Sequence, residues 1–278
     1  MSAGLIAIVI RQVDLSYVKS LAVRPQDLPW LVAAIGLFNL SKIAGALRLN
    51  GYQRHAAILM SERENLKLYY AGMFLNLFLP GGIGGDGYKI LVLRHQQGVP
   101  IKTLLWIFLT DRFSGLLILL LLLCMLAPLL ALPWPQAAVQ TIAAVGATTI
   151  AAMFVLAHHR LVKMHGERLA MVFGYGLAVQ LLQLVCMGML LAYLRVPIDA
   201  YLAYLAVFLI SSIAAVLPLS FGGLGAREVT FLYGLQLLQL DPMPGVVASA
   251  GFFLITVVSS LVGVLFLKGF PIKPPPAA

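Results

Sequence analysis

The sequence predicts an all-α membrane protein that crosses the bilayer several times. Of its 278 residues, 61% are hydrophobic and only 10% are charged. The apolar segments are too many and too long for one soluble core, and several approach the roughly 20 residues that a transmembrane helix needs. Unbroken apolar runs such as residues 116–123 exclude a transmembrane β-barrel, whose strands alternate apolar and polar positions. Cys124 and Cys186 lie within apolar segments, which is typical of small core residues and not of a disulfide or metal site.

Polar turns divide the apolar segments and predict the helices in chain order. Residues 1–27 form either an interfacial segment or a truncated first helix, because Arg11 follows the apolar residues 5–10 too soon for a span. Spans are expected at residues 28–47, 101–132, 137–157, 169–194 and 245–267, and shorter helices at 68–79, 86–94, 201–217 and 227–240. The basic, proline-rich residues 268–278 are predicted to form a disordered cytoplasmic tail.

One motif occurs twice, each time between short apolar helices. Residues 79–89 read LPGGIGGDGYK and residues 217–227 read LPLSFGGLGAR, so that Pro218 follows Pro80 by 138 residues. Proline and clustered glycines interrupt helices, and a broken helix at membrane depth is tolerated only where protein or a cavity satisfies its backbone. Paired interruptions at corresponding places in two halves of a chain indicate a transporter binding site.

The helices around the two motifs repeat with the same offset. Each half is predicted to be a span, a re-entrant helical hairpin and a second span, with residues 28–132 as the first half and 169–267 as the second. The single linking helix at 137–157 makes the second half enter the membrane from the opposite side. The repeat is therefore expected to be inverted, and the two hairpins to meet near the midplane.

The basic residues agree with this topology when residue 28 starts outside. The outer side then holds only Arg11, Lys19, Arg24 and Arg195, while Arg112 and Arg227 lie at membrane depth. All other lysines and arginines, Lys42 and Arg48 included, belong to the inner side, as the positive-inside rule requires. The net charge of +9 then reflects topology and attraction to anionic lipid, with no nucleic-acid partner. If both motif units instead cross the membrane fully, the loops still alternate between the two sides. The charges near residues 94–102 are then badly placed for the positive-inside rule.

The residues that follow each glycine cluster are candidates for ligand binding. A half-helix begins there, and its free N–H groups and dipole favour an anion. Lys89 and Arg227 stand at equivalent places near the start of these helices, where a basic side chain opposes the dipole, so we expect them to complete an anion site. The alternatives are that Lys89 only extends to the inner surface and that Arg227 pairs with Glu228.

Buried carboxylates need partners, because a charged side chain at the bilayer centre costs about 3 kcal/mol or more. Asp86 either caps its half-helix, holds a cationic part of the ligand, balances Arg112 or Arg227, or exchanges a proton. Asp111 and Arg112 are neighbours on a spanning helix and point about 100° apart. Each is therefore expected to reach a different partner, either a hairpin or the ligand.

Two further patterns are not expected to form sites. Gly82, Gly84 and Gly87 match a dinucleotide-binding pattern, but no βαβ unit surrounds them. The histidines of residues 158–168 lack acidic or cysteine companions, so we expect them in a solvated basic loop. No nucleophile and base pair points to catalysis, and no cofactor is predicted.

The predicted substrate site draws on both motifs and on the helix at 101–132. Its residues are Gly84, Gly85, Asp86, Lys89, Asp111, Arg112, Gly222, Gly223, Arg227 and Glu228, with Asn76, Pro80 and Pro218 in structural roles.

At residues 76–89, 110–115 and 218–228 the chain resembles the lysylphosphatidylglycerol synthase transmembrane, or flippase-like, family. This family includes the membrane half of the bacterial multiple peptide resistance factor. The matching motif positions are Asn76, Pro80, Gly84, Gly85, Asp86, Asp111, Arg112, Gly222, Gly223, Arg227 and Glu228. We expect a stand-alone member without the soluble aminoacyl-transfer domain of the bifunctional members, and Lys89 stands where many members carry arginine.

The resemblance implies a multi-pass protein of the bacterial inner membrane that moves lipids between leaflets. We expect a flippase that binds an anionic or zwitterionic lipid head group where the two hairpins meet. The alternative is a membrane enzyme or accessory subunit that acts on a glycolipid, hopanoid or isoprenoid-linked substrate. A scaffold for a lipid-synthesis enzyme is disfavoured because membrane-buried charges are costly. A second copy of the chain and a lipid-synthesis enzyme both remain open as protein partners.

Overall fold

The computed structural model describes residues 24–78, 84–216 and 225–270, and all regular structure within these ranges is helical. Pro80, Pro218, Gly222 and Gly223 lie outside the described residues, as do the predictions made for residues 1–23 and 271–278. Among the described residues, six helical stretches are long and apolar enough to cross a membrane: Pro25–His55, Ile101–Leu129, Gln136–Val162, Gly166–Tyr193, Ile198–Val216 and Pro242–Gly269. The chain is therefore a multi-pass membrane protein.

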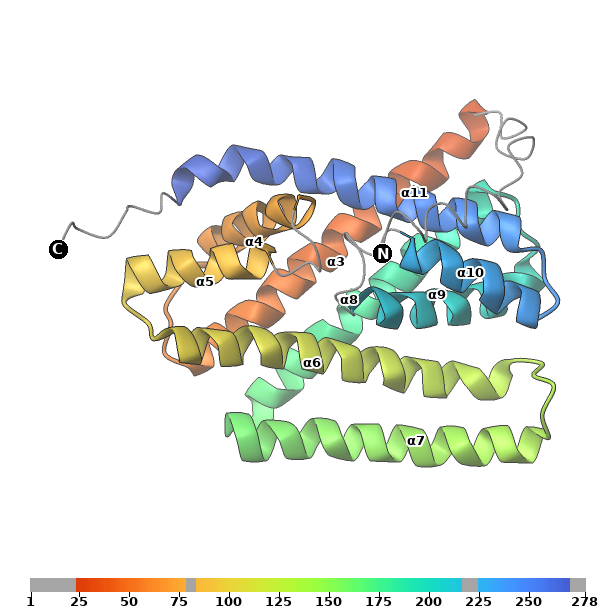
Figure 1. Cartoon of the computed structure of the whole chain (residues 1–278), viewed down its shortest axis with the longest axis horizontal. Helices are drawn as coiled ribbons and strands as arrows, with labels where there is room; N and C mark the ends of the chain where they lie inside the picture. Colours follow the sequence, from red (N-terminus) through yellow and green to blue (C-terminus); the bar gives the residue numbers. More distant parts are fainter. Residues whose placement is uncertain (1–23, 79–83, 217–224, 271–278) are drawn as a thin grey trace.

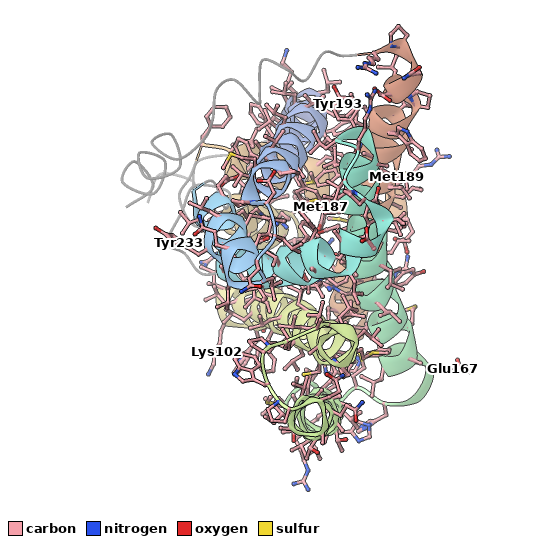
Figure 2. All side chains as sticks on the ribbon, turned by 90° about the vertical axis from the view of Figure 1, so that its right-hand side faces the viewer. Lys102, Glu167, Met187, Met189, Tyr193 and Tyr233 are labelled. Carbon is pink, nitrogen blue, oxygen red and sulfur yellow. The ribbon has the colours of Figure 1, made fainter. Side chains whose placement is uncertain are left out.

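Two long helices form the centre of the molecule. α3 (Leu28–His55) packs along α8 (Gly166–Tyr193), and both run diagonally through the middle of Figure 1. In Figure 2, Tyr193 at the end of α8 lies near the top of the view, and Glu167 near the start of α8 lies well below it at the right-hand side. α3 continues to His55, well beyond the predicted end at residue 47.

The extension of α3 corrects the predicted positions of two cations. Lys42 and Arg48 were expected at the inner surface, where long side chains can reach water. Lys42 instead lies in the middle of α3, and Arg48 is only 8% exposed. Both side chains therefore belong to the interior of the helix assembly.

Two pairs of shorter helices flank the central pair. α4 (Glu62–Asn76) packs on α5 (Gly84–Gln97), and α9 (Tyr201–Val216) packs on α10 (Ala226–Leu237). The carboxyl end of α4 and the amino end of α5 point toward the middle of the molecule, as do the corresponding ends of α9 and α10 (Figure 1). This arrangement brings the two copies of the repeated motif toward each other.

Three further helices enclose these pairs. α6 (Ile101–Leu126) continues into the turn Ala127–Leu129, and α7 (Gln136–Ala157) packs against it at one edge of the molecule (Figure 1). α11 (Pro242–Leu261) lies at the opposite edge and continues as the 3₁₀ helix η6 (Val262–Gly269), which packs on α4. The short 3₁₀ turns Pro25–Asp27 and Ile198–Ala200 precede α3 and α9.

The chain after α7 differs from the predicted solvated loop. α7 continues into a π-helical turn at His158–Val162, and His158 is only 1% exposed. Its Nδ1 lies 2.7 Å from the Phe154 carbonyl oxygen, and its Nε2 lies 2.7 Å from the Tyr52 hydroxyl. A proton on Nδ1 lets His158 donate to the carbonyl and accept from Tyr52, so this histidine joins α7 to α3.

Local capping explains why α4 begins earlier than the predicted residue 68. Ser61 and Glu64 form a capping box, in which the Glu64 N–H donates to the Ser61 hydroxyl and the Ser61 N–H donates to the Glu64 carboxylate. The Ser61 hydroxyl also donates to this carboxylate, and these hydrogen bonds lower the pKa of Glu64.

The apolar interior has two parts. The larger cluster joins α3, α8, α9, α10 and α11, and Phe252 contacts Phe38 and Phe208 edge to face within it, with ring centroids 5.4 and 5.0 Å apart. The smaller cluster lies at the other end and includes Leu49, Leu68, Leu93 and Leu104 from α3, α4, α5 and α6. The two clusters fix the helix pairs relative to the central helices.

Close backbone contact brings η6 onto α4. A Cβ atom at Gly263 would overlap the carbonyl oxygen of Tyr70, so only glycine permits this approach. Gly36 in α3 has open space around its Cα.

We expect Gly263→Ala to lower the free energy of unfolding by about 1–3 kcal/mol, because the added methyl group pushes η6 away from α4. Gly36→Ala is expected to leave it unchanged or to raise it by up to about 1 kcal/mol through helix propensity. Thermal unfolding of both variants in the same detergent measures the difference. Equal midpoints for the two variants would contradict the close packing of η6.

Candidate functional site

A polar cavity of about 300 Å³ lies where the inner ends of the two helix pairs meet. Its described lining comes from α3, α4, α6, α9, α10 and α11, and includes the end of α4 at Leu77. Three of the lining side chains are basic, and no described lining residue is acidic. The polar lining residues are Lys42, Tyr69, Asn76, Arg112, Ser212, Arg227, Thr256 and Ser260.

Asp86 connects the first helix pair to α6. One of its carboxylate oxygens lies 2.7 Å from Lys89 Nζ, and the other accepts a 2.6 Å hydrogen bond from Arg112 Nε. Lys89 is only 6% exposed and also lies over the rings of Tyr69 and Phe108, 4.9 and 5.0 Å from their centroids. Of the roles considered for Asp86, the structure shows the pairing with Arg112, and it adds a second partner in Lys89.

Asp111 reaches a different helix, as its position beside Arg112 predicts. Arg48 on α3 donates from Nε and Nη2 to the two Asp111 oxygens, at 2.8 and 3.1 Å. Side chains at Gly115 and Gly176 would crowd the Arg48 guanidinium, since an added Cβ would lie 3.3 and 3.4 Å from Nη1. The two neighbours on α6 thus bind α3 and α5, respectively.

Asn76 stabilises the hairpin ends of α4 and α5. Its Oδ1 accepts a 2.7 Å hydrogen bond from the Gly85 N–H at the start of α5. Gly85 approaches Gly72 so closely that a Cβ at Gly85 would overlap the Gly72 carbonyl oxygen. Asn76 thus satisfies a backbone group of the hairpin and also lines the cavity, and this N–H of α5 is already engaged by the protein.

Arg227 and Glu228 do not form an ion pair with each other. Arg227 Nη1 donates to the Ser212 hydroxyl at 3.1 Å, and its guanidinium lies 5.5 and 5.2 Å from the Phe208 and Phe252 ring centroids. Glu228 is 5% exposed and accepts hydrogen bonds from the Gly225 N–H and the Ser249 hydroxyl, at 2.7 and 2.9 Å. Glu228 therefore caps its own helix and joins it to α11.

The cavity contains only some of the predicted site residues. Arg112, Arg227 and Asn76 line it, whereas Gly84, Gly85, Asp86, Lys89, Asp111 and Glu228 do not. Asp86, Asp111 and Glu228 are the partners of surrounding groups, as described above. Lys42 lines the cavity but was missed as a site residue, because the prediction placed it at the inner surface near one end of the first span, although it is a basic residue inside an apolar helix pattern.

An apolar groove of about 420 Å³ lies next to the polar cavity. The two share Arg112 and Val216, and the groove is lined further by Asp86, Gly87 and Ile90 of α5 and by several α6 side chains. Leu105, Leu109 and Phe113 are 46%, 57% and 42% exposed, which suits contact with lipid chains. A separate apolar cavity of about 440 Å³ between α6, α7 and α8 has no charged residue in its described lining.

The Arg48–Asp111 pair generates a stability prediction. Arg48→Met should lower the free energy of unfolding by about 3–5 kcal/mol, because it leaves a largely buried carboxylate unpaired. The double variant Arg48→Met with Asp111→Leu should recover most of this loss, since it removes both charges. Chemical unfolding in detergent measures these differences.

Arg54→Met is the matched control. It breaks the exposed pair with Glu62, whose side chains are 52% and 44% exposed, and should cost less than about 1 kcal/mol. Similar losses for Arg48→Met and Arg54→Met would mean that Asp111 does not depend on Arg48.

Comparison with known proteins assigns the chain to a family. Neither a curated protein nor a solved structure matches the chain significantly. The family model described as the lysylphosphatidylglycerol synthase TM region matches residues 1–263, which is nearly the whole chain. This match confirms the resemblance expected from the repeated motifs and indicates a role in lipid metabolism or transport. The chain belongs to the lysylphosphatidylglycerol synthase transmembrane family.

Proposed function

We propose that this protein moves a phospholipid or a lipid-linked head group between the leaflets of the bacterial inner membrane by alternating access. The observation that carries this proposal is the polar cavity between the two helix pairs, with Lys42, Arg112 and Arg227 in its lining. Cations inside a membrane protein are costly in free energy unless an opposite charge compensates them, and an anionic head group would supply that charge. The adjacent groove offers the attached chains an apolar surface.

In this proposal both short helix pairs are re-entrant hairpins. α4, α5 and α10 have 15, 14 and 12 residues. At 1.5 Å per residue they are roughly 18–23 Å long, which is short of the hydrocarbon core of about 30 Å. Ile198–Val216 is long enough to cross, but its partner α10 is too short to return across the whole bilayer.

The proposal also includes an inverted repeat. α3, the α4–α5 pair and α6 would correspond to α8, the α9–α10 pair and α11, and α7 would be the linking helix. An inverted repeat supplies the two related conformations that alternating access needs, because each half can adopt the arrangement of the other. The central packing of α3 on α8 would then join equivalent helices of the two halves.

The orientation that we propose follows the positive-inside rule and places the carboxyl terminus in the cytoplasm. Arg54, Lys102 and Lys163 would face the cytoplasm, and Arg195 the outside.

Arg227→Gln should slow lipid translocation roughly tenfold or more, because it removes a charged donor from the cavity. The readout is movement of a chain-labelled anionic lipid in proteoliposomes. Lys102→Gln removes an equal charge from an exposed residue at the edge of the molecule (Figure 2) and should keep the wild-type rate. Equal rates for Arg227→Gln and wild type would refute the role of this cavity, and a lipid of changed mass would favour the enzyme alternative.

Single-cysteine labelling tests the orientation after Cys124 and Cys186 are replaced by alanine. Arg54→Cys and Lys102→Cys should react with a membrane-impermeant reagent only from the cytoplasmic side, and Arg195→Cys only from the outside. Phe78→Cys, just beyond α4, should not react from the outside if the first pair is re-entrant. Outside labelling of Phe78→Cys would instead indicate that α4 and α5 cross the membrane fully.

A further inference from the structure

We propose that the head group bound in the polar cavity is a terminal phosphate, a phosphomonoester, which carries a charge of about −1.5 to −2 at pH 7 and no ammonium group. This inference rests on the proposed function, since it names the lipid class that the cavity would take. It separates such lipids from phosphodiesters, which carry one negative charge, and from aminoacylated lipids.

The carboxylates around the cavity are all occupied by the protein. Asp86, Asp111 and Glu228 each have both oxygens engaged by donors of the described residues. None of the three carboxylates belongs to the lining of the polar cavity, which contains the basic residues. A head group with an ammonium group would need a carboxylate or an aromatic cage, and would also have to approach three cations. The described lining therefore disfavours an aminoacylated head group.

Two of the cavity cations have no acidic partner. No carboxylate oxygen of the described residues lies within 4.0 Å of Lys42 or Arg227, in contrast to Arg112. Lys42 lies over the Phe38 ring at 4.4 Å, and Arg227 contacts two rings and the Ser212 hydroxyl. Rings and hydroxyls solvate a cation only in part and leave its charge unbalanced.

The charge balance around the cavity leaves a surplus of about two positive charges. The Arg48–Asp111 pair is neutral, and the remaining groups supply four positive charges against two negative ones: Lys42, Lys89, Arg112 and Arg227 against Asp86 and Glu228. The motif residues 79–83 and 217–224 contain no charged residue in the sequence. A phosphomonoester carries about −1.5 to −2 at pH 7, which matches this surplus.

The geometry of the donors also suits a phosphate. Arg112 and Arg227 come from α6 and α10, one from each predicted half, and guanidinium groups bind phosphate oxygens with two donors at a time. Lys42, Tyr69 and Ser260 line the same space and can add single hydrogen bonds. A cavity of about 300 Å³ is at the small end of ligand sites, so it fits a compact head group better than a large one.

The neighbouring groove indicates that the phosphate is attached to a lipid. Arg112 and Val216 border both the cavity and the groove, so a phosphate held by Arg112 directs its ester chain toward Leu109 and Phe113. These α6 side chains are exposed and apolar, as contact with a membrane-embedded chain requires. Free phosphate would use only the polar half of this combined site.

The test compares four chain-labelled lipids in wild-type proteoliposomes: phosphatidic acid, a prenyl phosphate, phosphatidylglycerol and lysylphosphatidylglycerol. We expect one or both phosphomonoesters to move roughly tenfold faster than phosphatidylglycerol, and the lysyl lipid to move slowest. Binding to the detergent-solubilised protein, measured by native mass spectrometry with inorganic phosphate as competitor, should show the same order. Phosphate alone should compete weakly, because it leaves the groove empty.

The outcomes separate this inference from the proposed function. Movement of phosphatidylglycerol or the lysyl lipid as fast as both phosphomonoesters overturns the inference and leaves the flippase proposal standing. If no lipid moves while phosphomonoesters still bind selectively, the transport proposal fails and the inference stands. Equal binding of all four lipids, or competition by phosphate as strong as by the lipids, overturns the inference.

Ser212→Asp provides a variant with the opposite expectation. An aspartate beside Arg227 supplies one of the missing negative charges from the protein, so the preference for phosphomonoester over phosphatidylglycerol should fall roughly tenfold. Ser212→Asn, which is similar in size to the aspartate but uncharged, separates the effect of charge from that of the larger side chain, and its preference should fall less than that of Ser212→Asp. An unchanged preference in a folded Ser212→Asp protein overturns the charge-balance argument.

Discussion

The packing of the helices depends on the pairing of charged side chains in the interior of the protein, where water cannot solvate them. The Asp86 carboxylate, held between Lys89 and Arg112, shows how the chain meets this constraint. It joins a short helix pair to a long spanning helix and allows three charged side chains to be largely removed from water. Arg48 and Asp111 repeat the same solution between α3 and α6. Lys42 and Arg227 have no carboxylate partner among the described residues, and both lie in the lining of the polar cavity.

The sequence predicted the helical class, the order of the helices and the family, because long apolar segments and spaced glycine motifs are local signals. It also predicted that Asp111 and Arg112 reach different partners, since helix geometry separates neighbouring side chains by a known angle. The inverted repeat, the hairpins and the ligand-binding role of the site remain predictions.

The sequence predicted less where burial depends on distant segments. Asn50 and Gln53 lie beyond the predicted end of the first span at residue 47, yet they are 1% and 0% exposed among neighbouring helices. For the same reason Lys42 and Arg48 were assigned to the inner surface and His158 to a solvated loop. A polar residue on one helix gives no indication of the partner that another helix will bring, such as Asp111 for Arg48 or Tyr52 for His158. These errors concern tertiary pairing and not local helix formation.

The adjacent Asp111 and Arg112 have a mechanical consequence. One holds α6 to α3 and the other holds α6 to α5, in directions about 100° apart around the helix axis. Two such ion pairs oppose rotation of α6 about its own axis, whereas a single ion pair would permit it. A torque applied to α6, for example where α7 packs on it, is therefore transmitted to α3 and α5 together. The two ion pairs therefore couple the position of α6 to the positions of both α3 and α5.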